Sequence, residues 1–348
     1  MLKDIAAICL ALFCTHALAQ DKLRVAATPN PNIFPLLVAM AEDPALPVEI
    51  VPVANGADID AAFSNGKADA LLAMTYTIAD KVTTRRIPDL RLVFVGLWKG
   101  FSEVTYRQDH IGNFGDLQGK GLIVSGPAGG GKDGGPDMIF QAALRRSGMK
   151  LSDFHVCYLP VMEAMKLLNS HSLLNSNPQC DPSLSMPASG ISLVEPATTG
   201  MIMQGMMQGM ERGISFQPLF TGYTAWPEDQ LPHGGFAALG SVLKDPEKRQ
   251  VFEKVLAAYK RSAAEISQAR AFRAMRIARE ISSGIKQYFQ PYKLDLPAPV
   301  VRIAMMKGNL LFRADASPSI QGDLSRFLTE VVGTAPPDDF YALQPSAP

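Results

Sequence analysis

The chain has 348 residues, of which 47% are hydrophobic and only 19% charged, so it can form the cores of two ordinary domains. Its 33 lysines and arginines balance its 33 aspartates and glutamates, and no excess of positive charge is present to attract nucleic acid. Composition and charge therefore exclude a disordered chain and argue against nucleic acid as a partner.

The first nineteen residues have the pattern of a cleaved secretory signal. Lys3 precedes an apolar run, Ile5–Phe13, and the small-x-small sequence Ala17–Ala19 suits a signal peptidase. A membrane span needs about 20 apolar residues, so the run is too short, and no later segment is long and apolar enough. We expect cleavage after Ala19 and a soluble protein outside the cytoplasm; a short membrane anchor is the alternative.

Short apolar strands alternate with helices from residue 22 onward. Strands are predicted over residues 22–28, 48–53 and 68–74, with helices within residues 33–43 and 56–67. Two further strands, separated at Lys99–Gly100, are expected between residues 90 and 107. This alternation predicts an α/β fold with a parallel sheet.

A second α/β series is expected after a crossover that we place at residues 107–112. Its strands are predicted over residues 121–125, 154–159, 191–196 and 214–220, and its helices over residues 137–147, 161–168 and 198–211. From Gly235 the chain is expected to be helical, with helices over residues 245–266, 270–288 and 300–312.

A glycine-rich loop follows the predicted strand at residues 121–125. Gly126–Lys132 matches the phosphate-binding pattern GxxxxGK, but Asp133 stands where Ser or Thr holds Mg²⁺, which argues against a nucleotide site. The glycines still let backbone N–H groups converge, and a helix starting near Pro136 favours negative charge. The loop therefore predicts a binding site for an anion or a polar solute.

The mature chain contains two cysteines, Cys157 and Cys180. An even number of cysteines outside the cytoplasm predicts a disulfide, which closes a segment rich in Asn, Ser and Pro. Two unpaired thiols are the alternative.

Three segments resemble the solute-binding subunits of ABC importers for sulfonates, taurine, nitrate and thiamine precursors. They are FGDLQGKGLIVSGPAGGG, NGKADALLAM and SLVEPATTGM. Residues 162–191 depart from that family, which has a helix, a short Gly-x-x-Asp-Ala turn and a strand there, whereas this segment is rich in Asn, Ser and Pro. The resemblance implies a bilobal type II periplasmic-binding-protein fold, with two parallel or mixed sheets joined by a hinge. It also implies a monomer without cofactor, which captures a small polar or anionic solute in the periplasm and delivers it to an ABC permease in the inner membrane.

On this basis we divide the chain into five parts. They are the signal peptide (1–19), the first part of lobe 1 (20–107), lobe 2 (108–224), a mostly helical return to lobe 1 (225–335) and a flexible tail (336–348).

Ligands of parallel α/β sheets bind beyond the carboxyl ends of the strands. This rule selects Thr28, Asn30, Asn32, Thr75, Tyr76, Ser125, Gly129, Gly130, Gly131, Lys132 and Glu195. We add Trp226, an aromatic residue near the point where the chain returns to the first lobe, as a further candidate for ligand contact. Hydroxyl and amide groups suit an oxyanion, to which Lys132 can add a charge, whereas Glu195 suits an ammonium or amino-pyrimidine donor. Ordinary turns and helix caps are the alternative explanation of these polar residues.

A methionine-rich helix offers a different function. Met203, Met206, Met207 and Met210 suggest thioether ligands for Cu(I), although flexible packing explains the same spacing. The chain has neither an HExxH nor a GxSxG motif, and we do not expect an enzyme. An enzyme on the same bilobal fold, and a periplasmic sensor or copper-handling protein, are the alternatives.

Overall fold

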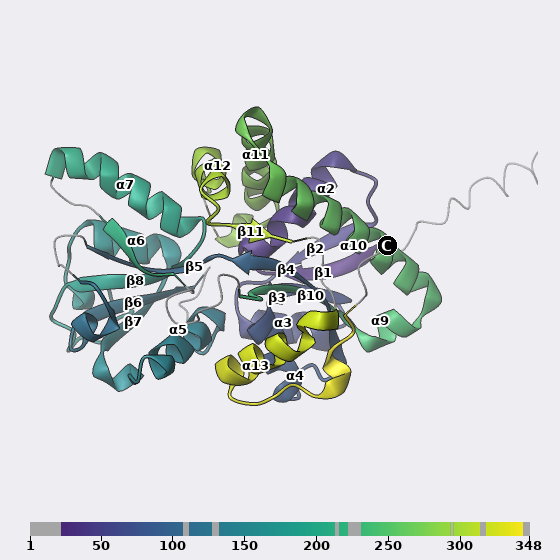
Figure 1. Cartoon of the computed structure of the whole chain (residues 1–348), viewed down its shortest axis with the longest axis horizontal. Coiled ribbons are helices and arrows are strands. Elements are labelled where there is room, and N and C mark those ends of the chain that lie inside the picture. Colours follow the sequence, from purple (N-terminus) through teal and green to yellow (C-terminus); the bar gives the residue numbers. More distant parts are fainter. Residues whose placement is uncertain are drawn as a thin grey trace, which may run out of the picture.

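The computed structural model describes residues 22–106, 111–126, 132–212, 216–221, 231–292, 294, 296–313 and 318–343. The chain forms two α/β lobes, each built on one β-sheet, which lie side by side along the long axis of the molecule (Figure 1). This arrangement confirms the predicted bilobal α/β fold. The predicted signal peptide lies outside the described residues.

The sheet of the first lobe has six strands in the described part of the chain, in the order β11-β4-β10-β3-β1-β2. The strands are β1 (Leu23–Ala27), β2 (Val48–Pro52), β3 (Ala70–Met74), β4 (Leu90–Lys99), β10 (Gly234–Leu239) and β11 (Leu311–Phe312). Strand β1 runs parallel to β2 and β3, whereas β10 is antiparallel to both β3 and β4. Every residue of β3 is buried, as expected for a central strand covered on both faces.

The sheet of the second lobe has five strands in the described residues, in the order β7-β6-β8-β5-β9. The strands are β5 (Phe101–Tyr106), β6 (Gly121–Gly126), β7 (His155–Pro160), β8 (Ala188–Val194) and β9 (Phe216–Thr221). Strand β6 is parallel to β7 and β8, and β5 is antiparallel to β8 and β9. Only Gly100 separates β4 from β5, so the chain passes directly from one sheet to the other.

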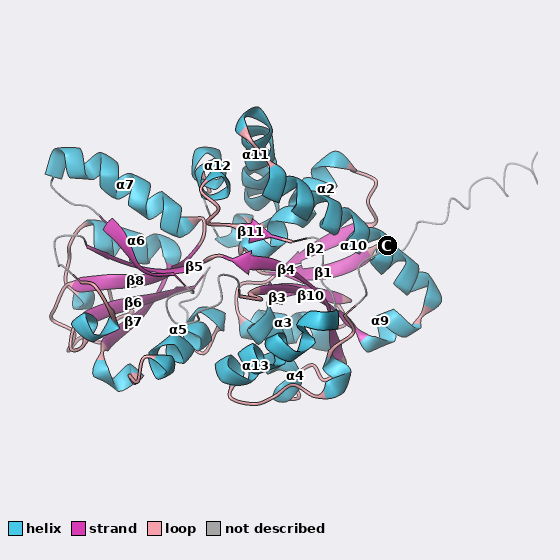
Figure 2. Cartoon of the chain, in the orientation of Figure 1, coloured by secondary structure: helices cyan, strands magenta, loops and turns pink. Residues whose placement is uncertain are grey.

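Helices cover both faces of each sheet (Figure 2). In the first lobe and the C-terminal part they are α2 (Phe34–Glu42), α3 (Gly56–Ser64), α4 (Thr75–Thr83), α9 (Gly240–Lys244), α10 (Pro246–Gln268), α11 (Ala271–Tyr288), α12 (Ala298–Met306) and α13 (Gln321–Val332). In the second lobe they are α5 (Gly135–Arg146), α6 (Val161–Asn169) and α7 (Ala197–Arg212). The N-cap Asp245 starts the long helix α10 by accepting the backbone N–H groups of Glu247 and Lys248.

The C-terminal helices connect the lobes on two sides. Helix α12 packs against α11 of the first lobe and α7 of the second, and α13 packs against α4 of the first and α5 of the second. At the second contact, Arg146 on α5 forms an ion pair of 2.8 Å with Glu330 on α13. The segment after α11 is therefore positioned to follow any change in the relative position of the lobes.

The predicted disulfide is confirmed. Cys157 on β7 is bonded to Cys180, their Cα atoms lie 5.2 Å apart, and both residues are buried. The bond fixes the polar segment between α6 and β8 to the sheet of the second lobe. Leu174 and Leu184 from that segment join the same apolar cluster as the two cysteines.

Three expectations about the C-terminal half are wrong. Residues 235–239 are not helical but form β10, where a Cβ atom at Gly234 would lie 2.7 Å from Asn32 Oδ1. Leu311 and Phe312 pair with β4 instead of ending a helix. The segment expected to begin a flexible tail packs on the first lobe, because Phe340 is fully buried and the Ala342 N–H donates to the carbonyl of Leu92. The exact lobe boundaries stay a prediction.

None of the helices in the described ranges combines the length with the apolar character that a membrane crossing requires.

Candidate functional site

A cavity of about 250 Å³ lies between the two lobes. The first lobe contributes the segment after β1, including Pro29, Pro31 and Phe34, together with Ile285 on α11. The second lobe contributes residues of α6, the end of β8 and the first turns of α7. The segment that leads into α12 and Val300 on that helix complete the lining, and α12 itself contacts both lobes.

The position of the cavity follows from the sheet topology. Strand β1 ends at Ala27 and β8 ends at Val194, and the residues that follow both strands line the cavity. Ligands of open α/β sheets bind in this position, beyond the carboxyl ends of parallel strands. The cavity is therefore the best candidate for a binding site.

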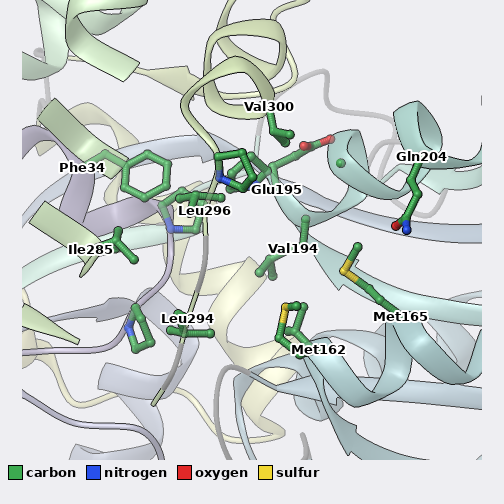
Figure 3. A pocket seen from close by; sticks show the side chains of 17 residues that line it. Phe34, Met162, Met165, Val194, Glu195, Gln204, Ile285, Leu294, Leu296 and Val300 are labelled. Carbon is green, nitrogen blue, oxygen red and sulfur yellow. The ribbon is translucent and has the colours of Figure 1, made fainter. Parts of the chain in front are cut away.

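The lining is mainly apolar. Of the 17 described residues around the cavity, Glu195 and Gln204 are the two with polar side chains. Figure 3 shows Phe34 and Ile285 on one side of the cavity and Met165 and Gln204 on the other. This composition suits an organic molecule with a substantial apolar surface better than a small, fully hydrated ion.

Glu195 is 3% exposed and follows the last residue of β8. Its Oε2 atom accepts hydrogen bonds from the hydroxyl of Thr199, at 2.7 Å, and from the Thr199 N–H, at 3.2 Å. The Asn309 side-chain amide donates to the Thr199 hydroxyl at 3.0 Å, which links this group to the segment between α12 and β11. Burial raises the pKa of Glu195, although the hydrogen bonds of Thr199 and Asn309 and the charge of Lys99 oppose the effect.

Gln204 is the second polar group of the lining and lies on α7. Its Oε1 accepts a hydrogen bond of 3.0 Å from the side-chain amide of Asn169, at the end of α6. The bond holds α6 and α7 together beside the cavity.

The predicted residues after β1 serve the fold. The Asn30 side chain accepts the N–H of Asn32 and donates to the hydroxyl of Thr28. Asn32 is fully buried, where it donates to the carbonyl of Gly235 at 2.7 Å and accepts from the Tyr259 hydroxyl at 2.9 Å. The intervening prolines, not these polar side chains, line the cavity.

Thr75 and Tyr76 lie at the start of α4, outside the cavity lining. The Thr75 hydroxyl donates to the carbonyl of Pro232, and the ring of Tyr76 packs edge-on against His233 and Phe327. Burial raises the pKa of the Tyr76 hydroxyl. These contacts hold the segment that returns from the second lobe, so both residues have a structural role here.

Ser125 and Lys132, near the glycine-rich loop, also lie outside the lining. Ser125 is buried and donates to the carbonyl of Ser192 at 2.7 Å, which joins β6 to β8. Lys132 is exposed to solvent. Gly129, Gly130, Gly131 and Trp226 lie outside the described residues. Glu195 is thus the one described member of the predicted set that lines the cavity, and a ligand role for the others stays a prediction.

The methionine hypothesis is untested. Met203 is half-buried on α7, while the side chains of Met206, Met207 and Met210 fall outside the described part of the structure. Among the described residues no group of three or more His, Cys, Asp or Glu side chains is arranged to hold a metal ion. That observation does not bear on thioether ligands.

Sequence reasoning missed the apolar wall of the site. Apart from Phe34, an aromatic residue that the sequence already offers as a possible stacking partner of a ligand, its main members are Met162, Met165, Ile285, Leu294 and Val300. In the sequence they look like ordinary core residues, and three of them, Ile285, Leu294 and Val300, come from the C-terminal return. One usable signal was the helical spacing of α6, which places the apolar Met162 on the side opposite the buried Leu167 and Leu168; in the structure it is 50% exposed.

Comparison with known proteins gives a consistent picture of the fold. No family model and no curated protein sequence matches the chain. Among solved structures, the Escherichia coli periplasmic aliphatic sulphonate-binding protein SsuA matches with a TM-score of 0.63 and 14% identity, over 94% of this chain and 93% of that one.

Two further solved structures have the same architecture. The alkanesulfonate-binding protein SsuA from Xanthomonas axonopodis pv. citri, bound to MOPS, has a TM-score of 0.60 and 13% identity, with 93% and 98% coverage. The ligand-binding component of an ABC-type import system from Staphylococcus aureus, with zinc bound, has a TM-score of 0.60 and 14% identity, with 94% and 97% coverage. The chain therefore has the fold of periplasmic solute-binding proteins.

Proposed function

We propose that the chain is an exported solute-binding protein, which captures a small organic solute between its lobes and delivers it to an ABC permease in the inner membrane. The observation that carries this proposal is the cavity between the lobes, at the carboxyl ends of β1 and β8. The functions of the structural neighbours support it, since one is a periplasmic sulphonate-binding protein and another is the ligand-binding component of an ABC-type import system. A periplasmic location, with the signal peptide removed after Ala19, is part of the proposal.

Closure of the lobes around the solute supplies the mechanism. The lining comes from both lobes, so a solute that contacts both walls stabilises the closed arrangement over the open one by its differential affinity. Helices α12 and α13 each contact both lobes and would change their packing as the lobes move. A permease that recognises only the closed surface then receives loaded protein in preference to empty protein.

A solute screen combined with small-angle scattering tests the proposal. Mature protein is screened by thermal shift against sulfonates, nitrate, phosphonates, dicarboxylates, amines, alcohols, amino-pyrimidines and Cu(I). A solute at 100 times its dissociation constant adds about 2.7 kcal/mol to the free energy of unfolding. The expected result is a shift with an organic solute, a smaller radius of gyration in its presence and recovery of the solute unchanged.

A cavity-blocking variant provides the control. Val300→Trp places a large side chain in the cavity and is expected to abolish the shift, whereas Met306→Trp on the same helix lies outside the lining and is expected to preserve it. Chemical conversion of the solute would favour the enzyme alternative. A shift with Cu(I) alone would favour the copper-handling alternative. Equal binding by both tryptophan variants would show that the solute binds elsewhere.

A further inference from the structure

The described lining of the cavity contains no side chain that carries a positive charge. None of its described lining residues is Lys, Arg or His. Lys132, after the glycine-rich loop, is exposed to solvent, and Lys99, whose charge acts on Glu195, is not part of the lining. A sulfonate transferred from water into this apolar wall would lose its hydration without gaining a counter-charge from the described residues.

Two helix N-termini of the second lobe carry a carboxyl group of the chain itself. Glu195 accepts the Thr199 N–H in the first turn of α7. Asp137, in the first turn of α5, is buried and accepts both the Asp133 N–H and the Tyr158 hydroxyl, each at 3.0 Å. Helix N-termini attract anions through their free N–H groups and dipole. Here an incoming anion would meet Glu195, a carboxyl group, at the helix start that borders the cavity.

Glu195 has room for a further donor. Thr199 donates two hydrogen bonds to Oε2 and the Asn309 side chain donates a third to the carboxyl group, whereas a carboxylate has about four acceptor positions. The residue borders the cavity beside Val300 and is 3% exposed, so a hydrogen bond to its carboxyl group would form where little water competes. A charge-assisted hydrogen bond is strongest under these conditions.

We propose that the solute is a predominantly apolar molecule whose amine or other non-anionic hydrogen-bond donor binds Glu195, and that the cavity discriminates against oxyanions. This inference rests on the proposed function and specifies its ligand class. It separates the chain from the structural neighbours that bind sulfonates, because the similarity to them extends to the fold alone. The apolar body contacts Phe34, Ile285 and the methionines of α6, which form the two facing walls in Figure 3.

Three probes with one common apolar body test the inference. 2-Phenylethylamine, 2-phenylethanol and 2-phenylethanesulfonate are titrated into the mature protein by calorimetry at pH 7. The amine is expected to bind about ten-fold or more tightly than the sulfonate. The amine gains a charge-assisted hydrogen bond to Glu195, whereas the sulfonate is repelled by the same carboxylate, and this difference in binding free energy exceeds the 1.4 kcal/mol that corresponds to a ten-fold change in affinity. The alcohol is expected to bind with intermediate affinity.

Glu195→Gln tests the residue itself. Glutamine can still accept from Thr199 but carries no charge, so the variant is expected to lose about ten-fold in affinity for the amine while affinity for the alcohol changes little. Glu163→Gln, the same change on the exposed face of α6 and outside the lining, is the matched control and is expected to bind like the wild type.

The outcomes separate the inference from the proposed function. Tightest binding of the sulfonate, accompanied by compaction, would overturn the ligand class and leave the solute-binding function intact. Binding of the amine that Glu195→Gln does not weaken would overturn the role of Glu195. If none of the three probes binds, the inference is also overturned, and the broad solute screen then decides on the function. The comparison of the probes on the wild-type protein remains decisive even if the variant does not fold.

Discussion

His233 offers a test of the structure that needs no ligand. It lies on the segment that returns from the second lobe, directly before β10, and is 1% exposed. Its ring packs edge-on against Tyr76 and Phe327, and its Nε2 atom has no hydrogen-bond partner within the described part of the structure. Burial lowers the pKa of His233 to about 4 from its ordinary value of 6.5, because the imidazolium form would lose its hydration.

The lowered pKa makes stability depend on pH in a defined window. Between pH 6.5 and pH 4 the unfolded chain binds a proton at this histidine and the folded chain does not, so stability falls as the pH falls. Above pH 6.5 both states are neutral at His233 and the effect disappears. With these two pKa values the loss is about 2 kcal/mol at pH 5 and about 3 kcal/mol at pH 4.

Urea unfolding from pH 7 to pH 4.5 measures this effect. Other groups also titrate in this range, so the informative quantity is the difference between the wild type and His233→Leu, a variant that cannot bind the proton. The variant is expected to lose less stability on acidification, by about 2 kcal/mol at pH 5. His155→Leu, a change at an exposed histidine on β7, is expected to follow the wild type. If the free energy of unfolding had the same pH dependence in the wild type and in His233→Leu, the conclusion that His233 is buried in its neutral form would be refuted.

Two further predictions concern stability at neutral pH. Replacing Cys157 and Cys180 with serine removes a crosslink with a sequence separation of 23 residues. In the chain-entropy model this change is expected to lower the free energy of unfolding, measured with urea, by about 3 kcal/mol. A reducing agent that destabilises the wild type but not the double variant would confirm the cause. Tyr259→Phe removes the hydroxyl that donates to the Asn32 carbonyl and side chain, and is expected to cost about 1 to 3 kcal/mol. Tyr288→Phe on α11 is its control, and equal effects of the two changes would contradict the role given to the buried hydroxyl.

Much of the fold could be predicted because its local patterns agree with its packing. The strands ALLAM and GLIVSG are both fully buried and consist almost entirely of apolar residues and glycine, as strands covered on both faces require. Helix α10 begins at an Asp-Pro pair and buries Val251, Val255 and Tyr259 at helical spacing. In each of these segments the residues that the sequence pattern predicts to be buried are buried in the structure.

Strand β10 could not be predicted because its reason is distant in the sequence. Gly234 and Gly235 look like a turn, but they lie against Asn32 and Leu92, where a Cβ atom would approach other atoms to less than 3 Å. Phe236 is opposite both Leu72 on β3 and Phe94 on β4, so the segment is held as a strand by neighbours on either side. Tertiary pairing determines this element, and no local propensity indicates it.

The site was only partly predictable for a related reason. The carboxyl ends of the strands need polar residues both to bind ligands and to cap the helices that follow, and a sequence does not distinguish the two uses. The side chains of Asn30, Asn32 and Ser125 form hydrogen bonds within the protein and do not line the cavity, whereas Glu195 caps α7 and also lines the cavity. The apolar walls could not be predicted, because apolar residues that face a cavity and apolar residues that face the core have the same spacing along a helix or strand. A polar residue that both caps a helix and borders an apolar cavity is therefore the most informative feature of this site, and it is the structure that identifies it.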